Sequence, residues 1–403
     1  MSRDHDPAVS QRSLQAALEI NVTMIGFLFL AAALLANQNW WDRHFLPLFF
    51  LSHEKYLLSE RLARLAMAVL GLGIIFAVRP LLGRLARRVP ARDFAAGVLR
   101  IMLAMALAFA VMEWSMSHKF VHAAAEMQPG EEPMRQPDAK LGWVFTPSHD
   151  GVVLAGERWI GYSTDGLGYR VPSRDAAVDV NQPSIIFTGE SIIAGYGLNW
   201  QETIPAQVAT ATNIQSATIA VFGYANDQAY LRLASELPRF RAPVAVVSVF
   251  APSLFARNLG DDRPHLDAQL QWIPATHRLW LTSLLRFLVP YHSQAEIEQG
   301  IQATRAQLLA TAALARKRGA IALVVDPQFS PETPIERMLR RRILDESGVE
   351  YVRVMLDPSW HLKGDLHPDP RAAYVIAMAI ASRLKANLAQ KNDSASLSGA
   401  DAN

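Results

Sequence analysis

Three long apolar stretches near the amino terminus constrain the fold of this chain more than any other feature. They cover residues 22–36, 65–78 and 94–112, and Arg100 is the one charged residue within them. A membrane-spanning helix needs about 17–25 mainly apolar residues, so each stretch lies near the lower limit for a span. Buried core helices are the alternative, but these stretches lack the polar stripe that a soluble helix turns toward water. We therefore predict three transmembrane helices within a membrane domain at residues 21–116.

Arginine residues predict the orientation of this membrane domain. The short segment 79–92 contains Arg79, Arg84, Arg87, Arg88 and Arg92. The positive-inside rule places such a segment in the cytoplasm. The amino-terminal segment 1–20 is then cytoplasmic, whereas segment 37–64 and everything after residue 115 are external. A cleaved signal peptide is the weaker alternative, because the later apolar stretches would keep the chain anchored.

The short apolar segment 45–50, FLPLFF, is too short to cross a bilayer. Either it dips into the membrane interface or it packs on the helices.

Beyond the apolar stretches the sequence alternates between strand and helix patterns. Strand-like runs cover residues 184–188, 217–221, 244–250, 321–325 and 351–355. Helical patterns cover residues 203–211, 226–237, 296–318 and 371–389. This alternation favours an α/β fold with a parallel sheet and helices on both faces. Chemistry in such sheets gathers at the carboxyl ends of the strands.

The same patterns suggest how the external part is divided. Residues 117–180 are expected to form a linker and lead-in module, and residues 181–390 the main domain. Segment 260–298 interrupts that domain as an insertion. It is either an amphipathic helix that covers the core, or a lid or membrane-contacting surface. The polar tail at 391–403 is expected to be disordered.

Composition excludes several classes of site and partner. A formal net charge of +2 gives no reason to expect a nucleic-acid partner. The absence of cysteine removes disulfides, thiolate zinc sites and a cysteine nucleophile. The histidines lack metal-ligand spacing, and the sequence has no phosphate-binding glycine loop, so neither metal nor cofactor is expected. A nucleophile, if one is present, must be a hydroxyl.

Two separate segments carry residues suited to that chemistry. The run 184–188 leads directly into Gly189-Glu190-Ser191, which places a serine where a strand ends, although an ordinary turn has the same composition. Near the other end, Asp365 and His367 precede the closing helix. A histidine can take the serine proton while a carboxylate fixes its tautomer, so the two segments support one another.

Together these segments resemble the SGNH (GDSL-type) hydrolase superfamily over roughly residues 138–390. Gly189-Glu190-Ser191 is similar to its nucleophile block, residues 220–228 to its second block, and Asp365 with His367 to its last block. The resemblance implies a three-layer α/β/α flavodoxin-like fold and ester chemistry through a seryl intermediate. It implies Ser191 as nucleophile, His367 as base and Asp365 as its orienting acid. The backbone N–H groups of Ser191 and Gly223 would stabilise the oxyanion.

This sequence departs from the family pattern at two positions. Pro252 stands where the third block normally has an asparagine that donates to the oxyanion, and Asn258 or Asn226 could substitute for it. The acid lies two residues before His367. The commoner spacing falls on Gly364, and Asp357 is a fallback.

The resemblance and the predicted topology together imply a function. We expect a membrane-anchored serine esterase in a bacterial inner membrane, with its hydrolase domain facing the periplasm or the exterior. It would remove acyl groups, often O-acetyl, from envelope or exported polysaccharide, so its partners would be the bilayer and an ester-bearing carbohydrate. Two alternatives remain open: a glycan acyltransferase that uses the same serine, and a catalytically weak glycan-binding or scaffold protein.

Overall fold

The computed structural model describes residues 7–46, 53–123, 134–276 and 278–400. The chain divides into two compact units. The first unit contains the apolar helices together with segment 279–291, and the second contains most of the remaining chain. Residues 47–50 of the apolar segment 45–50 and residues 124–133 of the expected linker lie outside the described residues.

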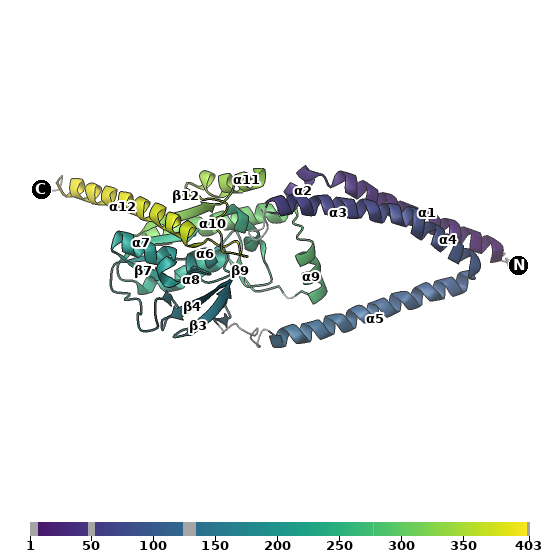
Figure 1. Ribbon diagram of the computed structural model, residues 1–403, viewed down its shortest axis with the longest axis horizontal. Helices are drawn as coiled ribbons and strands as arrows, with labels where there is room; N and C mark the ends of the chain where they lie inside the picture. Colours follow the sequence, from purple (N-terminus) through teal and green to yellow (C-terminus); the bar gives the residue numbers. More distant parts are fainter. Residues whose placement is uncertain (1–6, 47–52, 124–133, 277, 401–403) are drawn as a thin grey trace. The chain divides into compact units, whose positions relative to one another are not determined.

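Among the described residues, the first unit contains three helices that are long and apolar enough to cross a membrane, as predicted. The candidate spans are Gln15–Leu35, Glu54–Arg88 and Arg92–Met116. Figure 1 shows the helices that carry them. These helical segments are α1 (Pro7–Leu35), α2 (Gln38–His44), α3 (His53–Gly73), the π-helical turn η1 (Ile74–Val78), α4 (Arg79–Arg88) and α5 (Ala91–Ala123).

The arginine-rich segment 79–92 differs from the predicted loop. Helix continues from α3 through η1 and α4 as far as Arg88, and only Val89 and Pro90 separate it from α5. Pro90 explains the break, because the residue before a proline is forced into extended backbone, as Val89 is. Arg79 pairs with Glu19 of α1 at 3.5 Å.

Two glycines allow α1 and α3 to pack closely. A Cβ added to Gly71 would lie 2.8 Å from the carbonyl oxygen of Gly26 and 2.9 Å from Leu30 Cγ. A Cβ added to Gly26 would lie 2.5 Å from Ile75 Cγ1. Small residues let helix backbones approach in a membrane, where apolar burial does not drive helices together. Gly73 lies on the same helix but has no atom within 4 Å of its added Cβ.

We predict that Gly71→Ala destabilises the helical unit by about 1–3 kcal/mol, because the new methyl group overpacks the α1–α3 contact. Gly73→Ala is the matched control and should be neutral or slightly stabilising. Thermal aggregation of the detergent-solubilised chain, followed by size-exclusion chromatography, measures both effects. Equal melting temperatures for the two variants would contradict the glycine contact.

The second unit is built on an eight-stranded sheet with the order β12-β11-β8-β6-β7-β5-β4-β3. The strands on one side of the sheet are parallel: β6 (Ser184–Phe187), β7 (Gln215–Thr218), β8 (Pro243–Val249), β11 (Ile321–Gln328) and β12 (Tyr351–Met355). Counted along the chain, they take the flavodoxin-like order 2-1-3-4-5. The predicted fold class is therefore confirmed.

Helices cover both faces of this sheet, because successive strand residues point to opposite sides. Ile185 and Phe187 face a core shared with α7 and α12, whereas Ile186 faces a core shared with α8 and α10. Figure 1 shows α12 in yellow at the carboxyl end of the chain. The helices of this unit are α6 (Ser191–Ala194), η2 (Trp200–Glu202), α7 (Ile204–Thr212), α8 (Asn226–Glu236), η3 (Leu237–Arg239), η4 (Pro252–Leu259), α10 (Gln294–Lys317), α11 (Pro334–Ile343), η5 (Asp345–Ser347) and α12 (Pro370–Ala400).

The lead-in segment extends the sheet rather than forming a separate layer. Strands β3 (Asp150–Ala155), β4 (Arg158–Thr164) and β5 (Arg170–Val171) add to it in antiparallel fashion. Strands β1 (Arg135–Asp138) and β2 (Gly142–Phe145) form a separate hairpin.

The insertion 260–298 contains a small hairpin of β9 (His265–Leu266) and β10 (Trp272–Ile273), followed by helix α9 (Trp280–Leu288). At the carboxyl end, α12 continues to Ala400 through most of the tail that was expected to be disordered. No proline stands in this tail, and its one glycine, Gly399, lies at the last turn of the helix.

Candidate active site

The serine at 191 begins a short helix directly after strand β6. Gly189 links them with φ +146°, and an added Cβ would lie 2.8 Å from Val249 Cγ1, so no larger residue fits there. Glu190 caps α6 by accepting the N–H of Ile192 at 3.1 Å. Ser191 is 4% exposed. The turn therefore fixes the hydroxyl at the carboxyl edge of the sheet, next to the junction of β6 and β8 where the strand order reverses.

His367, which lies 176 residues further along the chain, contacts this serine. His367 Nε2 lies 2.8 Å from Ser191 Oγ, and His367 Nδ1 lies 2.6 Å from Asp365 Oδ1. The turn that carries them closes through the N–H of Leu362, which donates to the His367 carbonyl at 2.9 Å. The short Asp-x-His spacing thus lets the carboxylate reach the ring. Asp357, the fallback, instead accepts hydrogen bonds from Ser359.

The charge on Asp365 sets the tautomer of the imidazole. Burial opposes its ionisation, but hydrogen bonds from the ring and the backbone N–H of His367 outweigh burial and hold the pKa of Asp365 below its usual range. An ionised Asp365 accepts the Nδ1–H, which leaves the lone pair of Nε2 facing Ser191. The arrangement can therefore take a proton from the hydroxyl.

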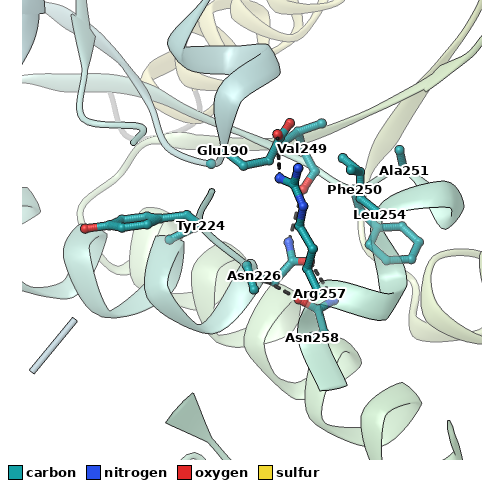
Figure 2. Close-up of a pocket in the computed structure, with 12 residues that line it drawn as sticks. Glu190, Tyr224, Asn226, Val249, Phe250, Ala251, Leu254, Arg257 and Asn258 are labelled. Atoms are coloured by element: carbon teal, nitrogen blue, oxygen red, sulfur yellow. Dashed lines mark hydrogen bonds and ion pairs between the residues drawn. The ribbon is translucent and has the colours of Figure 1, made fainter. Parts of the chain in front are cut away.

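A second carboxylate also contacts the serine. Glu190 Oε2 lies 2.6 Å from Ser191 Oγ, and Arg257 donates to the same oxygen at 3.2 Å. Figure 2 shows the Arg257 guanidinium reaching Glu190 from η4, beside a cavity of ≈ 20 Å³. The hydroxyl has one proton and two acceptors, so Glu190 competes with His367 for it, and Arg257 weakens that competition by neutralising Glu190.

Two backbone donors and one side chain were expected at the oxyanion site. The N–H of Val221 donates to Gly189 O at 3.2 Å and holds the Gly223 loop beside the nucleophile turn. Neither the N–H of Ser191 nor that of Gly223 donates to any other residue in the described part of the chain, so both remain available.

Asn258 is placed differently from the expectation. Its amide donates to Asn226 Oδ1 at 3.0 Å and to Thr304 Oγ1 at 2.9 Å, while its oxygen accepts the N–H of Asn226. The Asn226 amide in turn donates to Val249 O at 3.1 Å. Figure 2 shows Asn258 turned toward Asn226. Both asparagines hold η4 against its neighbours, and the Asn258 amide already donates to two side chains.

Arg170 holds the backbone that follows Ser191 in place. The sequence pattern did not assign this residue to the site. Arg170, 1% exposed, donates to the carbonyls of Ala194, Gly195 and Leu198 at 2.5, 2.6 and 2.6 Å. Burial lowers the pKa of Arg170 to about 10, which still leaves it protonated at neutral pH. The guanidinium also lies 4.2 Å from the Tyr162 ring.

We predict that Arg170→Met destabilises the second unit by about 3 kcal/mol or more, because three buried carbonyls lose the guanidinium that donates to them. Arg174→Met is the control, since Arg174 is exposed and pairs with Asp150 at the surface. Urea unfolding followed by tryptophan fluorescence measures both. A similar urea midpoint for both variants would show that the hydrogen bonds of Arg170 do not stabilise the second unit.

Aromatic rings line the site beside the histidine. The Tyr196 ring lies 4.6 Å from the His367 ring and 5.3 Å from Phe222. Trp143 Nε1 donates to Phe222 O at 2.9 Å, which fixes the loop that carries Gly223. These rings give the site an apolar wall. The described residues contain no group of three or more acidic or histidine side chains placed to hold a metal ion.

Comparisons with known proteins return structural matches alone. No family model matches the sequence, and no curated protein matches it. An acetyl xylan esterase from Butyrivibrio proteoclasticus is 11% identical over 53% of this chain and 65% of its own, with a TM-score of 0.34. A GDSL-like lipase from Bacteroides thetaiotaomicron is 13% identical over 51% and 88%, with a TM-score of 0.32. An aryl esterase from M. smegmatis is 10% identical over 51% and 99%, also with a TM-score of 0.32.

Proposed function

We propose that this chain is a membrane-anchored serine ester hydrolase whose active site faces the exterior of a bacterial inner membrane. One observation carries the proposal: the aligned contacts from Ser191 Oγ to His367 Nε2 and from His367 Nδ1 to Asp365. The three apolar helices support the anchoring, and the arginines at the end of the second candidate span and the start of the third support the orientation.

In the proposed reaction Ser191 Oγ attacks the ester carbonyl while its proton moves to His367 Nε2. The carbonyl oxygen becomes an oxyanion that accepts the N–H groups of Ser191 and Gly223. His367 then returns the proton to the departing alcohol, and Asp365 stabilises the imidazolium throughout. Water activated by the same histidine cleaves the seryl ester, releases the acid and restores Ser191.

The substrate class we propose is a small acyl ester, such as an O-acetyl group, on envelope or exported polysaccharide. The external location would bring the site to such glycans, and the rings of Tyr196 and Phe222 offer an apolar wall near His367. The intact serine–histidine–aspartate contacts support turnover rather than glycan binding alone.

We predict that Ser191→Ala removes hydrolysis of p-nitrophenyl acetate and labelling by a fluorophosphonate probe, because both need the hydroxyl nucleophile. Asp365→Asn should lower kcat by roughly 10²–10⁴-fold, since the imidazole loses its orienting charge. Asp357→Asn is the matched control and should keep the parent rate. Unlabelled parent protein, or activity that survives in Ser191→Ala, would rule out the serine mechanism.

The charges on Glu190 and Arg257 provide a second test of the site. We predict that Arg257→Met lowers kcat by about 10–100-fold, because Glu190 then holds the Ser191 proton and repels the oxyanion. Removing both charges, in Arg257→Met with Glu190→Gln, should recover much of that loss. Initial rates on p-nitrophenyl acetate measure the four members of the cycle, with melting temperatures as the folding control. Strictly additive effects would show that the pair does not act on the serine.

A further inference from the structure

Helix α9 in the insertion 260–298 is strongly two-sided. At 100° per residue its apolar positions share one side and its polar positions the other. The apolar positions are Trp280, Leu281, Leu284, Leu285 and Leu288, and the polar positions are Thr282, Ser283 and Arg286.

Part of that apolar side lies uncovered. Leu285 is 53% exposed and Leu288 is 63% exposed, and Leu279 and Val289 at the two ends of the helix are exposed as well. An exposed cluster of large aliphatic side chains marks a contact surface, whereas single exposed leucines are ordinary.

The amino terminus of α9 is held by the third candidate span. The carboxylate of Glu113 in α5 accepts the N–H of Trp280 at 2.6 Å and that of Leu281 at 2.9 Å. Leu279 has no side chain that could cap the helix, so the cap comes from a residue 167 positions away. Trp114, beside Glu113, is 71% exposed, as expected for an aromatic residue at the edge of a bilayer.

The segment after α9 contacts α2, the short helix that follows the first candidate span. The Tyr291 ring stacks on His44 at 4.8 Å and on Trp40 at 6.2 Å, both in α2. With three spans in alternating directions, the carboxyl ends of α1 and α5 lie on the same side of the bilayer. Segment 279–291 belongs to the first unit. It contacts the rest of that unit at two places, and both lie on that side of the bilayer.

We propose that α9 is an interfacial helix whose Leu285 and Leu288 side chains insert among the lipid acyl chains of the outer leaflet. The occupant is lipid because the uncovered leucines adjoin two span ends marked by interfacial aromatics, and amphipathic helices bind bilayers in this way. The inference rests on the membrane anchoring in the proposed function. It adds a second membrane attachment that the serine chemistry does not require.

Spin labels on single cysteines test this directly, because the chain contains no native cysteine. The full-length variants Leu285→Cys and Leu288→Cys carry a nitroxide in nanodiscs of phosphatidylethanolamine and phosphatidylglycerol. Power saturation compares collisions with oxygen, which concentrates in lipid, and with a water-soluble nickel chelate. We expect a several-fold higher oxygen-to-nickel ratio at both positions than at Ser283→Cys on the polar side of α9.

Two further labels separate the possible outcomes. Leu107→Cys in the third span reports lipid if the chain is anchored, and Trp159→Cys reports water, because it is an exposed apolar residue of strand β4. Water-like values at Leu285 and Leu288 with a lipid-like Leu107 would overturn the interfacial helix but leave the anchoring intact. A water-like Leu107 would overturn both the anchoring and the interfacial helix. Hydrolysis of p-nitrophenyl acetate in the same samples reports separately on the serine site.

Discussion

One buried cation holds the backbone that follows Ser191 in the candidate site. Arg170 reaches from the antiparallel extension of the sheet to three carbonyls just after the nucleophile helix. A guanidinium presents five donors in a planar fork, so it can satisfy several converging carbonyls that no lysine could serve in the same geometry. The lead-in strands are therefore part of the framework of the candidate site, because without them the carbonyls of Ala194, Gly195 and Leu198 would lose the guanidinium that they bind.

The rest of the site is assembled at the carboxyl edge of the parallel strands. Strand β6 delivers Ser191 and the loop after β7 delivers Gly223, while β8 leads into η4 with Arg257. In η4, Pro252 is followed five residues later by the cation Arg257, which pairs with Glu190. The surroundings of the Ser191 hydroxyl therefore include a paired charge, Glu190 with Arg257, besides His367.

Sequence patterns predicted the parallel strands to within a few residues, because buried strands here are short apolar runs. They also predicted α7, α8 and α10, but not α11. The contacts among Ser191, His367 and Asp365 followed from family resemblance. The Glu190–Arg257 pair and the carbonyls bound by Arg170 could not be predicted, since their partners lie 67 and up to 28 residues apart with no pattern to join them. Helix α12 extends to Ala400, beyond its predicted end at residue 389, because polar composition alone does not end a helix.

The place of α9 in the chain has a practical consequence. Segment 279–291, which packs on the apolar helices, lies in the sequence between η4 and α10 of the α/β unit. A soluble fragment obtained by cutting before β1 would therefore still carry exposed leucines and a helix whose cap, Glu113, had been removed. Producing the α/β unit alone calls for a cut before β1 and for the replacement of residues 279–291 by a short polar linker.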